Sequence, residues 1–119
     1  SKGTFLWTAK DDAHLAAGSF FAEILRRSGW VEISAPPGGR IEFELGQRLA
    51  GNREEFGPAL VFLFLAKDRN QISNTWRTVE QFFVRCGFVL LDPNRKGEYR
   101  SDDNAIRIHI IVGMGRHSH

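Results

Sequence analysis

The sequence predicts a single α/β domain with a mixed sheet of about six strands and two helices. Its most telling segment, Ala59–Ala66, is an unbroken apolar run that suits a strand buried on both faces, with layers above and below it. The 119 residues fit one domain. We expect the element order β-α-β-β-β-α-β-β, with residues 1–112 in the globular domain and 113–119 as a flexible tail.

The first strand and the first helix have clear boundary signals. The segment TFLWT at residues 4–8 predicts a strand, and we expect a helix over Asp11–Ser28. Two acidic residues open this helix, where the dipole favours negative charge, and Gly29 is a suitable stop. Gly18 weakens the middle of the helix by about 1 kcal/mol relative to alanine, a cost that packing can offset.

The next segments alternate in hydropathy and predict a hairpin. Trp30–Ala35 and Arg40–Leu45 flank Pro36-Pro37-Gly38-Gly39, which has the composition of a hairpin turn. We therefore expect these two strands to pair antiparallel. Residues 46–58, with their glycines and charges, predict a loop or a broken helical turn.

The second helix has the clearest period in the chain, with apolar residues that step by four, three, four and three. This core-facing stripe comprises Ile72, Trp76, Val79, Phe83 and Cys86. Together with the strands before and after it, Ala59–Ala66 and Phe88–Leu91, the helix resembles a βαβ unit. A long polar connection at residues 92–104 then leads to a last strand, Ala105–Val112, with isoleucines on one face and Arg107 and His109 on the other.

Composition limits the function classes. The formal charge of +2 is too small for a nucleic-acid footprint over the whole surface, so a basic site has to be local. Cys86 is the only cysteine, which excludes an intramolecular disulfide and favours a reducing, intracellular and cytoplasmic location. No apolar run approaches the roughly 20 residues of a membrane-spanning helix.

The chemistry-bearing residues form no catalytic set, and we expect a non-enzymatic protein without cofactor or metal. No glycine-rich phosphate loop, nucleophile elbow or cysteine pair is present. Cys86 is expected at a helix carboxyl end, where the dipole opposes a thiolate. A metal site on His109, His117 and His119 is an alternative, as is an Smr-like nuclease fragment, because GMGRHS at residues 113–118 resembles the GxGxHS element of that family.

The basic residues suggest a local binding surface. They follow the buried strand, lie on the second helix and recur in the polar connection: Lys67, Arg69, Arg77, Arg95, Lys96 and Arg100. If helix and connection pack side by side, these residues can meet an acidic protein or a phosphate backbone. We expect an acidic protein partner; the alternative is an RNA- or DNA-binding module that adds Trp7, Trp30 or Tyr99 as stacking surfaces.

Roughly half of the chain resembles the ornithine decarboxylase antizymes. VFLFLAKDR at 61–69 is similar to their buried strand followed by a lysine and an arginine, and RTVEQFFVRCGFVLLDP at 77–93 is similar to their helix that runs into a GF-strand-Pro segment. DDNAIRIHII at 102–111 resembles their final strand, and GGRIEFELG at 38–46 their glycine-rich turn and amphipathic strand.

This resemblance implies an acetyltransferase-like sheet without its chemistry. It also implies a regulatory protein that binds a decarboxylase subunit, inhibits it by blocking its dimerisation and directs it to degradation. Lys67 and Arg69 match the contact positions of the family. The helix expected at Asp11–Ser28 departs from the antizyme pattern.

Overall fold

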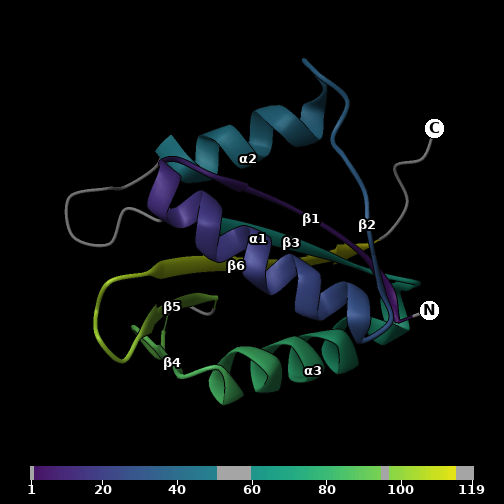
Figure 1. Cartoon of the computed structure of the whole chain (residues 1–119). Coiled ribbons are helices and arrows are strands. Elements are labelled where there is room, and N and C mark those ends of the chain that lie inside the picture. The colour runs from purple at the N-terminus through teal and green to yellow at the C-terminus, as the bar shows by residue number, and fades with distance from the viewer. Residues whose placement is uncertain (1, 51–59, 95–96, 115–119) are drawn as a thin grey trace.

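The computed structural model describes residues 2–50, 60–94 and 97–114, and it confirms an α+β domain with a mixed six-stranded sheet (Figure 1). The described segments contain three α-helices rather than the two expected. The elements are β1 Gly3–Ala9, α1 Asp12–Arg27, β2 Trp30–Glu32, α2 Arg40–Ala50, β3 Leu60–Ala66, the 3-10 turn η1 Arg69–Gln71, α3 Ile72–Arg85, β4 Phe88–Leu90, β5 Glu98–Ser101 and β6 Arg107–Met114.

The sheet has the order β2-β1-β3-β6-β5-β4. The pairs β1–β2 and β3–β6 are parallel, and the other neighbours are antiparallel. β3 lies between β1 and β6 and is buried along almost its whole length, as its apolar run predicts. The expected βαβ unit is wrong in one respect, because β6 and β5 stand between β3 and β4.

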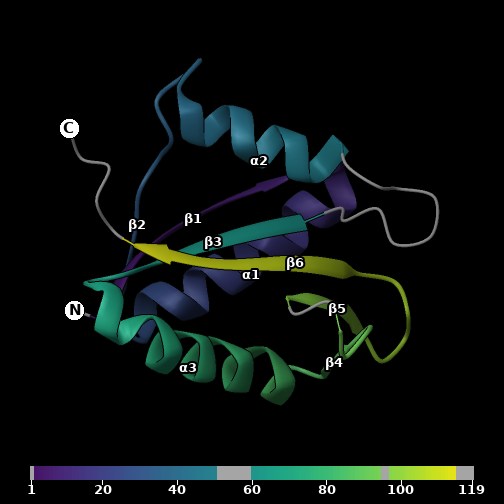
Figure 2. The ribbon, with the colours of Figure 1, turned by 180° about the vertical axis from the view of Figure 1, so that it is seen from behind.

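Helices cover the sheet from both sides. α1 and α3 lie on one face, and α2 packs over β1 and β3 on the other (Figures 1 and 2). Successive side chains of β3 point to opposite faces of the sheet and therefore contribute to both cores. Phe62 and Phe64 join the core under α1 and α3. Val61 and Leu65 join a smaller core under α2.

An aromatic cluster forms the centre of the larger core. The Phe21 ring of α1 lies 5.5 Å from that of Phe83 on α3 and 5.4 Å from that of Phe88 on β4. Phe83 also meets Phe62 of β3, with ring centroids 5.7 Å apart. These edge-to-face contacts join both helices to the sheet.

The expected hairpin strand Arg40–Leu45 is wrong, because these residues begin helix α2. Alternating apolar residues fit a strand, but Ile41, Leu45 and Leu49 also follow one helical face at steps of four, and this is the face that contacts the sheet. Phe43, the third member of the alternating set, points outward and is 65% exposed. Residues 46–50, expected in a loop, belong to this helix; residues 51–58 lie outside the described segments.

Three other boundaries differ from expectation. Of the expected strand Trp30–Ala35 only β2 forms, and it pairs parallel with β1 rather than in a hairpin. The polar connection at 92–104 contains β5, which is anchored by its one large hydrophobic residue, Tyr99. β6 extends to Met114, two residues into the expected tail, and the rest of the tail lies outside the described segments.

The expected boundaries of the first helix agree with the structure. Asp11 caps α1 through its carboxylate, which accepts the backbone N–H of His14 at 2.9 Å. Gly29 follows at φ +104°, a conformation that favours glycine. On α3, Val79 and Phe83 are buried as expected, but Cys86 is exposed because it lies beyond the last helical residue as the C-cap.

Candidate functional site

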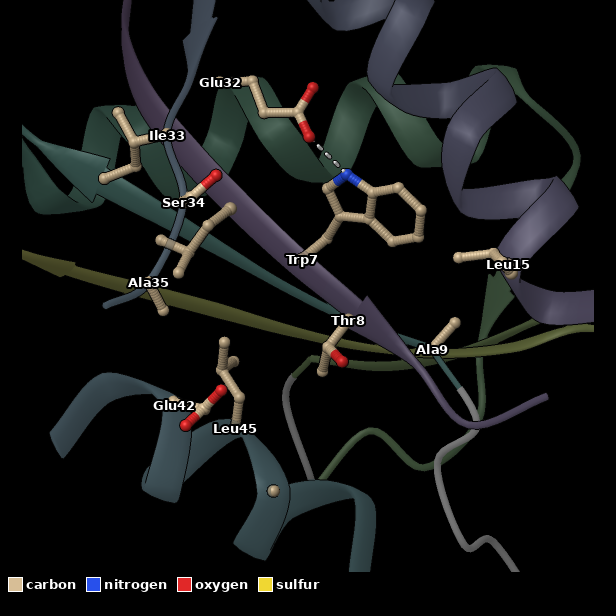
Figure 3. A pocket seen from close by; sticks show the side chains of 12 residues that line it. Trp7, Thr8, Ala9, Leu15, Glu32, Ile33, Ser34, Ala35, Glu42 and Leu45 are labelled. Carbon is tan, nitrogen blue, oxygen red and sulfur yellow. Dashed lines mark hydrogen bonds between the residues drawn. The ribbon is translucent and has the colours of Figure 1, made fainter. Parts of the chain in front are cut away.

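A pocket opens where β2 ends beside β1 (Figure 3). It has a volume of about 470 Å³ and lies between the end of β1, the chain that follows β2, the start of α1 and α2. We call it the β1 pocket; its lining residues are Leu6, Trp7, Thr8, Ala9, Leu15, Glu32, Ile33, Ser34, Ala35, Glu42, Leu45 and Gly46.

The β1 pocket exposes the backbone edge of β1. The last hydrogen bond between β1 and the chain of β2 runs from the N–H of Ile33 to the carbonyl of Phe5 at 2.9 Å. Since backbone groups alternate in direction along a strand, the N–H and C=O of Trp7 and Ala9 point the same way as those of Phe5, away from β3. Among the described residues, neither has a backbone hydrogen-bond partner on that side.

The charged side chains that line the β1 pocket among the described residues are two glutamates. The Glu32 carboxylate accepts the indole N–H of Trp7 at 2.8 Å and also pairs with Arg26. Glu42 accepts the backbone N–H of Gly38, and within the described residues it has no cationic partner. Among the described residues no basic side chain lines the pocket, so the carboxylate of Glu42 favours a cation there.

A second feature is the groove between α1 and α3, on the other side of α1. Two hollows of about 230 and 290 Å³ adjoin here, and both are lined by Lys2, Trp30 and Thr78. The remaining residues of this α1–α3 groove are Leu25, Ser28, Gln71, Asn74, Thr75, Val79, Gln81, Phe82, Arg85 and Cys86. Most polar lining groups are amides and hydroxyls, which can donate and accept hydrogen bonds.

Among the described residues, the charged side chains that line the α1–α3 groove are both basic. They are Lys2 and Arg85, and neither forms an ion pair within the described residues. Lys2 is fixed through its backbone N–H, which donates to the carbonyl of Gly29 at 3.1 Å. At the outer rim, the guanidinium of Arg77 donates to Asn74 at 3.1 Å and so holds an amide that lines the groove.

The structure does not bring all the expected basic residues together. Lys67 and Arg69 are exposed between β3 and α3, shortly before the groove residue Gln71 in the chain, and Arg77 is exposed on α3. Arg100 lies on the opposite face of the sheet, since its neighbour Tyr99 points to α3. Arg95 and Lys96 lie outside the described residues.

Sequence reasoning named Trp7 and Trp30, which line the two concave sites, but it missed the charged residues of both sites. Trp7 and Glu32 meet across 25 positions of the chain, and no local pattern predicts such a pair. The sequence did contain a pattern that could have predicted Arg85, because this residue shares the polar side of the second helix with Arg77. No sequence pattern predicts the place of Lys2, since it depends on β1 running beside the turn at Gly29.

The aromatic residues expected to stack on nucleic acid are poorly placed for it. Trp30 and Tyr99 are buried, and the half-buried Trp7 is held by Glu32. Burial, and then the hydrogen bond and charge of Glu80, raise the pKa of Tyr99. Burial likewise raises the pKa of Cys86, which makes its thiol a weaker nucleophile at neutral pH.

The part of the chain that the structure describes contains neither a cluster of metal ligands nor a membrane-spanning helix. There, no three His, Cys, Asp or Glu side chains are grouped to hold a metal ion, and His117 and His119 fall outside that part. No helix in it has the length and hydropathy to cross a membrane. Comparisons of the chain with protein-family models, curated proteins and solved structures give no match.

Proposed function

We propose that this domain is a non-enzymatic protein-binding module that captures an acidic segment of a partner in the α1–α3 groove. The observation that carries the proposal is the charge of the groove. Its charged lining residues, Lys2 and Arg85, are both basic and lack carboxylate partners among the described residues. A carboxylate side chain in the groove would gain charge-assisted hydrogen bonds from both.

The surroundings of the groove support the same partner chemistry. Lys67 and Arg69 shortly precede the groove residue Gln71 in the chain, and Arg77 holds the groove residue Asn74. Side chains of one sign around a groove steer an oppositely charged partner and fix its register more than they add affinity. Apolar contact comes from Phe82, which is half-buried in the groove wall.

The resemblance to antizymes gives this proposal a specific form. In that form, the partner is a decarboxylase subunit in the cytoplasm, and Lys67 and Arg69 are contact residues. The quoted strand GGRIEFELG no longer supports it, because that segment lies largely within helix α2. The similarity at residues 61–69 and 77–93 is unaffected.

The test is a pull-down from cytosol with the tagged domain, with and without nuclease. We expect the wild type to retain an acidic protein that resists nuclease, and the double variant Lys2→Glu/Arg85→Glu to lose it. Arg100→Glu is the matched control, since Arg100 lies on the other face of the sheet. Undiminished capture by the folded double variant would contradict the proposal.

A second pair of variants maps how far the contact extends. Lys67→Glu together with Arg69→Glu removes the charges shortly before Gln71 in the chain without touching the lining of the groove. We expect weaker capture with an almost unchanged melting temperature, because both residues are exposed. Recovery that vanishes with nuclease would instead replace the proposal by nucleic-acid binding, whose affinity falls steeply with salt.

A further inference from the structure

We propose that the β1 pocket is a strand-addition site for an extended peptide segment that carries a lysine or arginine side chain. This site is separate from the α1–α3 groove and takes a ligand of opposite charge. Three observations support it: the backbone edge of β1 that no described residue occupies, the adjoining cavity and the carboxylate of Glu42 in its wall.

The open edge supplies the hydrogen bonds. β2 follows β1 only as far as the bond from Ile33 to Phe5, and the chain then turns away toward α2. Beyond this bond, Trp7 and Ala9 each direct one backbone N–H and one backbone C=O toward the side of β1 on which β2 would continue. An extended peptide that pairs with this edge of β1 would add a strand to the sheet, which is the geometry of β-augmentation.

The cavity supplies room for side chains. Its volume of about 470 Å³ lies directly beside this edge, between β1 and α2 (Figure 3). Leu15, at the start of α1, is 50% exposed and lines the cavity, so an apolar peptide side chain would cover it. Specificity in strand addition comes from such pockets, while the backbone bonds supply affinity.

The charge selects a basic side chain. Glu42 uses one carboxylate oxygen for the N–H of Gly38, which leaves the other for a ligand. Arg40 does not compete, since it pairs with Glu44 at 3.5 Å. An ammonium or guanidinium in the cavity would pair with Glu42, whereas a carboxylate would meet the like charge of Glu42, and Glu32 is already neutralised by Arg26.

Amide exchange in the free protein tests the edge first. We expect the amides of Leu6 and Thr8, which point to β3, to exchange slowly and those of Trp7 and Ala9 to exchange fast. Slow exchange at Trp7 and Ala9 in the free monomer would overturn the proposal. Slow exchange that appears only at high concentration, with a dimer, would assign the edge to a second copy of this chain and overturn the peptide assignment.

Binding is then measured with a panel of capped heptapeptides that have alternating valine and threonine around a central lysine or arginine. The amides of Trp7 and Ala9 should shift and become protected, and a central glutamate should weaken binding by about tenfold or more. No shift with any basic peptide at millimolar concentration would overturn the proposal. Complete competition by capped lysine alone would also overturn it, in favour of a small-cation site.

Gly46 offers a variant that blocks the cavity without harming the fold. A Cβ at this position meets no atom within 4 Å, and the residue lines the pocket from α2. Gly46→Leu should fill the cavity and weaken peptide binding by about tenfold or more, while Gly46→Ala should not. Both should still capture the acidic partner, which separates this site from the groove.

The charge contribution has its own matched pair. Glu42→Gln should weaken binding of the lysine peptide, while Glu44→Gln, on the same helix but outside the pocket lining, should leave it unchanged. Wild-type affinity in folded Glu42→Gln or Gly46→Leu would overturn the proposal.

Discussion

Gly18 of α1 lies directly against the indole ring of Trp7 on β1, and the ring leaves no room for a Cβ at this position. On the sheet, the same indole stacks on Phe62 with ring centroids 5.8 Å apart. The glycine therefore sets how closely α1 approaches the sheet. Its cost to the helix is offset by the packing of a large aromatic ring.

Replacement of Gly18 by alanine should destabilise the protein although alanine favours helices. The gain of about 1 kcal/mol in helix propensity should be outweighed by overpacking, which typically costs about 1–3 kcal/mol, and more where a ring and a helix cannot separate. Thermal unfolding of Gly18→Ala measures the net effect.

Gly46→Ala is the matched control, because Gly46 is also helical but has open space around its Cβ direction. It should stabilise the protein by roughly 1 kcal/mol. Equal stabilisation by both alanines would show that Trp7 does not restrict Gly18.

Two adjacent residues of α3 should differ sharply in their contribution to stability. Phe83 is fully buried among aromatic rings, whereas Val84 is 53% exposed. Phe83→Ala should cost about 3–5 kcal/mol in the free energy of unfolding, and Val84→Ala less than about 1 kcal/mol. Chemical denaturation of both variants measures the difference, and similar costs would refute the assigned orientation of the helix.

The two long helices could be predicted because their periods are unambiguous, and α2 could not. In Arg40–Leu45 the alternating residues Ile41, Phe43 and Leu45 fit a strand, and the same stretch fits a helix through Ile41 and Leu45 alone. Leu49 favours the helix, but Gly46 interrupts the pattern. The choice depends on the sheet, which offers an apolar face over β1 and β3 to a helix.

The candidate sites depend on tertiary placement, which limits what sequence can predict. The basic residues of α3 can be recognised in the sequence. The β1 pocket cannot, because it forms where β2 separates from β1 after Ile33. β5 escaped detection for a related reason. Its side chain directed toward α3 is Tyr99, whose hydroxyl donates a hydrogen bond to the carboxylate of Glu80 at 2.7 Å. No local pattern in the sequence predicts this contact.

The thiol of Cys86 should be accessible to reagents but slow to react. The side chain is exposed at the end of α3, while partial burial raises its pKa and lowers the thiolate fraction at neutral pH. Alkylation of the native protein should therefore be slower at pH 7 than alkylation of the unfolded chain, and the difference should shrink as the pH rises through the pKa. A native rate above the unfolded rate at pH 7 would contradict this.

Tyr99 should resist ionisation until the protein unfolds. Because the chain has one tyrosine, the tyrosinate absorbance measures the ionisation of Tyr99 only. Burial, and then Glu80, raise its pKa in the folded state, so the folded protein holds the phenolic proton more tightly than the unfolded chain. The stability linked to this group is therefore complete below about pH 10, the value of an unfolded tyrosine. It is lost as the pH rises above that value toward the folded pKa.

A titration at 295 nm should show ionisation above pH 10 together with loss of ellipticity, and in Glu80→Gln the transition should move to lower pH. A reversible transition near pH 10 with the fold intact would mean that Tyr99 is open to solvent.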